Sequence, residues 1–279
     1  MFTKGITRKT DPYQALLTIY RRLILTLDYD TIGCGMKIDL DETRDDALRS
    51  LYNALVNHKV VCAGYAVAMQ YLLQSVGIVC GYVISESNIT KTECHAFNIL
   101  KIGKYCYYLD ATWGDKSTTG DTKNKDVVCY DYFCVPYNEF IRANPNMVPF
   151  HQPRKELYPT LETFEYKNHE YYRYHNAYIR SYNEEDLVKI FAESAINYDQ
   201  DEMGKFIVSF RCSDVTLMKH VISVLSAKGK IFDVVAKAKQ KAAQKSKKAA
   251  KLFDRTLEGH IADEYTGVVR YYFESPSKK

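Results

Sequence analysis

The sequence predicts an α+β protein in two parts: N-terminal helices packed on an antiparallel sheet, then a smaller α+β domain. Apolar residues recur at helical spacing over residues 12–27, 47–56 and 62–77. Residues 95–112 form two strand-like runs around a glycine, which is typical of a hairpin. Four of the seven prolines fall within residues 144–160, which indicates a linker before the composition changes.

The first two predicted helices are core elements. Asp11-Pro12 is a typical helix start, since aspartate caps the free N–H groups and proline is tolerated in the first turn. The apolar stripe that follows runs to Leu27. The second helix carries its apolar residues from Ala47 to Val56. Both stripes predict helices that bury one face.

A cysteine opens the third predicted helix. Cys62 precedes an apolar pattern that ends at Gly77, a residue type that often terminates helices. At a helix N-terminus the positive end of the helix dipole favours a thiolate, the nucleophilic form of cysteine. Residues 78–84 are expected to form the strand that follows.

The hairpin is expected to bring a histidine and an aspartate together. Gly103-Lys104 suits a two-residue type II′ turn, which pairs Ile102 with Tyr105. Because side chains alternate faces along a strand, His95 and Asp110 then share a face as diagonal neighbours, about 7–8 Å apart. Two side chains can close that distance with a hydrogen bond. A register shifted by one residue would put them on opposite faces.

Three motifs follow one another in this region: Val61-Cys62-x-Gly64-Tyr65-Ala66, His95-Ala96-aromatic-Asn98 and Asp110-x-Thr112-Trp113. Together they resemble the bacterial transglutaminase-like domains, whose core is papain-like. The resemblance extends to Tyr52-Asn53-Ala54-Leu55-Val56 and Tyr132-Phe133, and so covers about residues 11 to 140. Phe97 and Asn53 stand where the family often has tryptophan and glycine.

The resemblance implies a triad in which Cys62 is the nucleophile, His95 the base and Asp110 the group that orients the base. The order and chemistry of the three residues agree with that assignment. Tyr52 is either a core hydroxyl or a donor to the oxyanion beside the Cys62 backbone N–H. Trp113, the single tryptophan, either shields the Asp–His hydrogen bond or only packs.

The remaining elements show no second catalytic set. We expect a first domain over 1–143 with a polar connector at 114–126 and a short strand at 130–135. After the linker at 144–160, the second domain covers 161–279. Its predicted elements are a tyrosine-rich strand region at 162–181, helices at 183–196 and 213–225, a lysine-alanine helix at 236–251 and strands at 206–211 and 267–273.

Composition and charge limit the class of protein and the partners that the sequence suggests. Hydrophobic residues make up 46% and charged residues 26%, as in ordinary globular chains. The net charge of +4 is too small to imply a nucleic-acid partner. The lysine-alanine helix could hold phosphates or an anionic membrane, but it lacks interleaved aromatics and suits a solvated helix. We expect no nucleic-acid partner.

The cysteines and the apolar runs bear on location and cofactors. Eight cysteines fit disulfides in a secreted chain or reduced thiols in a cytosolic one. No signal-peptide pattern opens the chain and no run is long enough for a membrane span. We expect a soluble, reduced, cytoplasmic protein, with an earlier removed signal peptide as the alternative. Zinc-type and calcium-type spacings are missing, and Cys129 and Cys134 stand five apart, so we expect no metal or organic cofactor.

The predicted reaction is acyl transfer on a peptide or glutamine-type amide of a peptide or protein substrate. A thioester on Cys62 would be cleared by water, which makes a cysteine peptidase or amidase, or by an amine, which makes a transglutaminase. Hydrolysis is preferred, because water is always present and no acyl-acceptor site is visible in the sequence. A third interpretation is a non-catalytic interaction module that retains the triad. The substrate's identity and the oligomeric state stay open.

Overall fold

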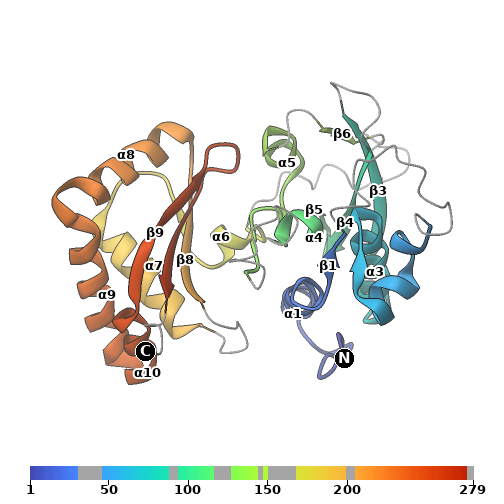
Figure 1. The fold of residues 1–279 in the computed structure, drawn as a ribbon, viewed down its shortest axis with the longest axis horizontal. Helices are drawn as coiled ribbons and strands as arrows, with labels where there is room; N and C mark the ends of the chain where they lie inside the picture. Colours follow the sequence, from blue (N-terminus) through green and yellow to red (C-terminus); the bar gives the residue numbers. More distant parts are fainter. Residues whose placement is uncertain are drawn as a thin grey trace. The chain divides into compact units, whose positions relative to one another are not determined.

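The computed structural model describes residues 1–30, 46–87, 94–115, 127–143, 147–149, 168–198 and 205–274. The chain divides into two compact units, Met1–Tyr171 and Tyr172–Lys279 (Figure 1). Apart from residues 147–149, the predicted linker lies outside the described residues. The polar connector predicted at 114–126 is described only at Gly114, which ends a short helix, and Asp115. The domain boundaries expected from the prolines therefore stay a prediction.

The first unit begins with the helix that the sequence predicts. Helix α1 spans Pro12–Ile24, and the Asp11 side chain accepts a hydrogen bond from the Gln14 backbone N–H at its start. One face of the helix is buried in the main core of this unit. Tyr20 lies on that face with no exposed surface.

A short parallel pairing leads the chain to the cysteine. Strand β1 (Asp28–Tyr29) pairs with β2 (Lys59–Val60), which ends two residues before Cys62. Between them, the helix predicted over 47–56 is only partly right, because Asn53–Asn57 forms the π-helix η1. Tyr52 is the residue directly before η1.

Helix α3 begins at the cysteine, as predicted, and spans Cys62–Ser75. Its first turn fits tightly against the preceding strand. A Cβ on Gly64 would lie 2.4 Å from the Val60 Cβ, so only glycine allows this approach. Gly77, at φ 89°, ends the helical region in the left-handed conformation that glycine favours.

Four other described strands of this unit form an antiparallel sheet in the order β5-β4-β3-β6. Their bounds are Cys80–Ser87 for β3, Cys94–Ile102 for β4, Tyr105–Leu109 for β5 and Met147–Pro149 for β6. The hairpin register is confirmed: Ile102 pairs with Tyr105, and Gly103 takes the positive φ of 59° that the first central residue of a type II′ turn requires. One face of the sheet packs in the core with α1 and α3.

The hairpin is shorter than predicted. Strand β5 ends at Leu109, and Ala111–Gly114 forms the short helix α4 rather than the end of a strand. The Asp110 side chain accepts a hydrogen bond from the Trp113 backbone N–H and so caps this helix. Asp110 thus stands at the junction of a strand and a helix.

The predicted strand at 130–135 is wrong. Residues 131–134 form turns and bends, and only Val135 makes an isolated bridge, to Tyr108. Cys134 has φ 53°, which is incompatible with a strand. Helix α5 (Tyr137–Ala143) follows, and its Phe140 packs on Phe97 and Tyr108 at the other face of the sheet.

The second unit is a sheet in the order β7-β8-β10-β9 with helices packed on it. Phe191 of helix α7 contacts Tyr271 and Phe273 of strand β10. Figure 1 shows α7 and α9 beside this sheet. The elements are α6 (Tyr171–Tyr174), β7 (Tyr178–Ile179), α7 (Glu184–Ile196), β8 (Lys205–Cys212), α8 (Val215–Ser226), η4 (Ala227–Gly229), α9 (Lys230–Lys245), α10 (Lys247–Ala250), η5 (Lys251–Asp254), β9 (Thr256–Asp263) and β10 (Val268–Glu274).

Two predictions for this unit need correction, and one strand was not predicted. The described part of the tyrosine-rich region is helical at Tyr171–Tyr174 and extended only at Tyr178–Ile179. Tertiary contacts override the strand preference of tyrosine there, since Tyr172 is fully buried with the Arg211 guanidinium over its ring. Helix α8 is capped by Asp214, one residue later than predicted. Strand β9 is absent from the prediction because its residues are mostly exposed and do not alternate.

The lysine-alanine helix predicted over 236–251 has other bounds, because α9 begins at Lys230 and ends at Lys245, where the extended backbone of Ser246 separates it from α10. Helix α9 buries small and apolar residues and turns its lysines outward. Several of these lysines form ion pairs with neighbouring acids: Lys237 with Glu184, Lys239 with Asp254 and Lys245 with Glu193. Exposed pairs of this kind are worth little individually, but they give the lysines a structural role. Across the described ranges, no helix is both long and apolar enough to cross a membrane.

Candidate active site

Cys62 is the first residue of α3, directly after the N-cap residue Val61. Its side chain is 8% exposed and lies among apolar neighbours that include Leu48 and Ala96. The backbone N–H of a first helical residue has no partner within its helix and points out of the helix end. The thiol therefore lies at the helix end that carries the first backbone N–H groups and the positive end of the helix dipole.

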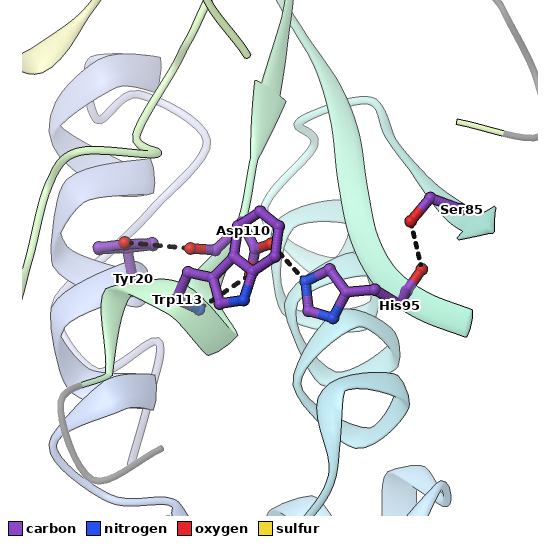
Figure 2. A network of polar contacts seen from close by, with 5 residues as sticks. All are labelled: Tyr20, Ser85, His95, Asp110 and Trp113. Atoms are coloured by element: carbon purple, nitrogen blue, oxygen red, sulfur yellow. Dashed lines mark hydrogen bonds and ion pairs between the residues drawn. The ribbon is translucent and has the colours of Figure 1, made fainter. Parts of the chain in front are cut away.

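His95 and Asp110 are in contact, as the predicted register requires. The His95 Nε2 atom lies 2.6 Å from the Asp110 Oδ2 atom, and the carboxylate has no exposed surface (Figure 2). The other carboxylate oxygen, Oδ1, accepts the Trp113 backbone N–H at 3.0 Å. The Ser85 hydroxyl donates to the His95 carbonyl oxygen at 3.3 Å, which ties the histidine's strand to β3. The imidazole is thus held by a fixed, buried acceptor.

The imidazole of His95 is also the group that lowers the pKa of the Cys62 thiol. Because Nε2 is bound to Asp110, Nδ1 is the ring nitrogen left to interact with the sulfur. Burial raises the pKa of the Cys62 thiol, but the hydrogen bond and charge of His95 and a backbone hydrogen bond from Ala96 lower the pKa by more. The net result is a pKa below the ordinary value of cysteine, which favours a thiolate.

The histidine shows the complementary shift. Burial lowers the pKa of His95, but the charge of Asp110, its hydrogen bond and the contact with Cys62 raise that pKa to about 10. A lowered cysteine pKa and a raised histidine pKa favour a thiolate–imidazolium pair. Such a pair holds a nucleophile and a proton donor ready at neutral pH.

Trp113 covers the histidine. The two rings stack at a centroid distance of 4.4 Å with planes 15° apart, and Tyr132 packs against the indole at 5.0 Å. Figure 2 shows the indole beside the His95–Asp110 hydrogen bond. The sequence allowed two roles for Trp113, shielding of the Asp–His hydrogen bond or packing alone. Its stack on the imidazole supports the shielding role, which remains a proposal.

Tyr52 is the most exposed of the predicted site residues. Its side chain is 68% exposed, so it is not the core hydroxyl that one interpretation expected. Its suggested part as an oxyanion donor stays a prediction. Among the described residues, no three His, Cys, Asp or Glu side chains gather as a metal site.

Sequence reasoning missed Tyr20, which supports the aspartate from α1. Its hydroxyl donates to the Cys129 carbonyl oxygen at 2.7 Å. It also lies 3.3 Å from the Asp110 carbonyl oxygen (Figure 2). A Cβ on Gly114 would lie 2.0 Å from that hydroxyl, so glycine allows the tyrosine to approach α4. The apolar stripe of α1 concealed this role, since a tyrosine in such a stripe is normally a packing residue.

Helices packed on an antiparallel sheet, with a cysteine at a helix start beside a histidine–aspartate pair, make a papain-like α+β architecture. Residues 1–145 match the family model of the transglutaminase-like superfamily. That match covers just over half of the 279 residues. The chain therefore belongs to the transglutaminase-like superfamily, and the predicted resemblance and fold class are confirmed at that level.

Two solved structures share part of the fold at low similarity. One is described as a TGase, with 12% identity and a TM-score of 0.33, and the match covers 37% of this chain and 27% of that one. The other is a putative cysteine protease from Cytophaga hutchinsonii, with 15% identity and a TM-score of 0.30, covering 53% and 39% respectively. The chain thus spans well under half the length of either protein. No curated protein matches it.

Proposed function

We propose that the first unit is a thiol-dependent acyl-transfer enzyme in which Cys62, His95 and Asp110 form a catalytic triad. The observation that carries this proposal is the hydrogen bond from the His95 imidazole to a fully buried carboxylate, beside a helix-start thiol whose pKa that imidazole lowers. A buried carboxylate with this partner fixes the ring's tautomer and favours its protonated form. Membership of a superfamily that includes transglutaminases and cysteine proteases supports it.

The proposed reaction begins with attack of the Cys62 sulfur on the carbonyl carbon of a peptide or glutamine-type amide. The backbone N–H of Cys62 donates a hydrogen bond to the oxygen that becomes negative. The tetrahedral intermediate then breaks its C–N bond as the His95 imidazolium gives its proton to the leaving amine. A thioester remains on Cys62, and Asp110 holds the ring throughout.

Hydrolysis is the preferred fate of the thioester. Neutral His95 takes a proton from water, which attacks the thioester carbon and releases a carboxylic acid and the free cysteine. Transamidation, with an amine in place of water, is the alternative. A non-catalytic interaction module predicts no turnover and an ordinary thiol.

The first test compares thiols within the same molecule. Iodoacetamide near neutral pH should label Cys62 first, measured by peptide mass spectrometry. Cys80 is an internal reference, since it lies in the same unit and burial raises its pKa to about 12. Equal labelling of Cys62 and Cys80 would favour the non-catalytic module.

The second test identifies the reaction. Peptides and proteins incubated with the enzyme, with and without an added amine, are compared by mass spectrometry. New fragments or deamidation indicate hydrolysis, and an added amine mass indicates transamidation. Cys62→Ala should abolish either product, whereas the matched variant Cys80→Ala removes another buried thiol and should not.

A further inference from the structure

A second buried carboxylate stands at the other end of α4. Asp110 precedes this helix and holds His95, whereas Asp115 follows it directly. The Tyr65 hydroxyl donates to the Asp115 Oδ2 atom at 2.5 Å. Tyr65 has no exposed surface and Asp115 is 1% exposed. A charge-assisted hydrogen bond out of water is stronger than one at the surface.

This hydrogen bond connects the helix that carries Cys62 to the helix that follows Asp110, without passing through His95. Tyr65 lies three residues after Cys62, so it belongs to the same first turn of α3. Asp115 lies at the end of the four-residue helix that begins after Asp110. The bond therefore fastens the turn that carries the sulfur to the helix whose cap holds the imidazole.

Close backbone contacts fix the surroundings of both helices. On α3, Gly64 fits against Val60 and the Leu48 carbonyl oxygen, where a Cβ would lie at 2.4 Å and 2.9 Å. On α4, Gly114 fits against Tyr20. These contacts set how closely each helix approaches its support. The Tyr65–Asp115 bond is directional and joins the two helices to each other.

We propose that Tyr65 and Asp115 are a positioning pair that sets the separation between the Cys62 sulfur and the His95 imidazole. The inference rests on the proposed function, because only an acyl-transfer site needs that separation held. We assign the pair a positioning role, exerted through α3 and α4, and no part in the reaction itself. A hydrogen bond weakens steeply with distance and angle, so a loosened α3 turn weakens the thiol–imidazole contact. A displacement of about 1 Å at such a site can cost about 10²-fold in rate.

The test uses variants that remove the bond or preserve it. Tyr65→Phe and Asp115→Ala each remove it, whereas Asp115→Asn keeps an acceptor oxygen without the charge. Tyr107→Phe is the matched control, because Tyr107 is another fully buried tyrosine of the same unit, and its hydroxyl bonds His169 instead. The double variant Tyr65→Phe/Asp115→Asn serves if Tyr65→Phe leaves a buried charge that prevents folding.

The readout is the rate of Cys62 alkylation by iodoacetamide as a function of pH, together with the thermal midpoint. We expect Tyr65→Phe and Asp115→Ala to raise the apparent pKa of the thiol by about one pH unit and to slow turnover about 10- to 100-fold. Asp115→Asn should stay close to the wild type. Tyr107→Phe should lower the thermal midpoint without moving the pH profile.

The outcomes separate the two proposals. If wild-type Cys62 alkylates with the pH profile of an ordinary thiol, the proposed function fails. If the wild-type profile is shifted to low pH and folded Tyr65→Phe or the double variant keeps it, the positioning pair alone is wrong. A shift in Asp115→Asn as large as in Asp115→Ala would also overturn it, since a variant that keeps the acceptor oxygen would then behave like one that removes it.

Discussion

Replacing Asp110 by asparagine tests the orientation of the imidazole. The new side chain keeps an oxygen that can accept the Trp113 N–H, so the cap of α4 survives. The other carboxylate oxygen, Oδ2, which accepts from His95 Nε2 at 2.6 Å, is replaced by an NH₂ group, which can only donate. Nε2 must then accept, and the ring proton moves to Nδ1, the ring nitrogen left to interact with the sulfur. The imidazole can no longer take the thiol proton.

The size of the effect follows from these contacts. Loss of the correct tautomer in a comparable triad costs about 10⁴-fold in turnover, and we expect about 10³- to 10⁴-fold here. Alkylation of Cys62 near pH 6 should slow at least about tenfold, because the thiol loses its imidazolium partner. A charge-assisted hydrogen bond becomes a neutral one, which costs about 1 kcal/mol and lowers the thermal midpoint by about 2–4 °C.

The stability loss should depend on pH in a defined direction. The pKa of His95 in the folded protein, about 10, lies above its ordinary value of 6.5. Its interaction with Asp110 therefore contributes stability fully below about pH 6.5 and loses that contribution as the pH rises through 10. The difference in unfolding free energy between wild type and Asp110→Asn should therefore shrink as the pH rises from about 6.5 to about 10. Denaturant titrations at several pH values measure it.

The control is the same chemical change at another helix start. Asp11 caps α1 through the Gln14 N–H, and asparagine is an equally good cap. Asp11→Asn should leave both alkylation and stability near wild type. If Asp110→Asn alkylates at the wild-type rate near pH 6, the carboxylate does not control the protonation of His95, and its orienting role is refuted.

Three further predictions concern the surroundings of the triad. Wild-type alkylation of Cys62 should persist well below the pH range of ordinary thiols, because the thiol's pKa is lowered, and a rate that rises only near pH 9 would contradict the site electrostatics. Trp113→Ala should lower stability by about 2–3 kcal/mol, less than a fully buried tryptophan would, and raise the thiol's apparent pKa. Trp113→Phe keeps a stacking ring and should change both less, and unfolding curves with alkylation profiles would show whether the stack matters. Gly114→Ala should destabilise by about 1–3 kcal/mol, since its Cβ would lie 2.0 Å from the Tyr20 hydroxyl, and an unchanged midpoint would show that this approach is not tight.

Much of the first unit follows from local patterns. The helix starting at Cys62, the turn at Gly103 and the register that joins His95 to Asp110 were all predictable, because each depends on residues close in sequence and on fixed periodicities. The hairpin's early end was not, because Asp110 can continue a strand or cap a helix. Only the Trp113 N–H beside its carboxylate decides between the two.

The contacts between distant segments could not be predicted in this way. Tyr20 approaches α4 from 90 positions away in the sequence, and Tyr65 meets Asp115 across 50. One sequence contains no signal for such pairs, because a buried tyrosine in an apolar stripe looks the same with or without a polar partner. Strand β9 was missed for a related reason, since an exposed strand carries no apolar alternation.

The single turn of α4 has a consequence for how this chain can change. Its two flanking carboxylates are directed to different partners, His95 and Tyr65, and their relative direction depends on the number of residues between them. One inserted or deleted residue would rotate one carboxylate by about 100° relative to the other. Many replacements between positions 110 and 115 could keep both contacts, but a change in the length of this segment could not.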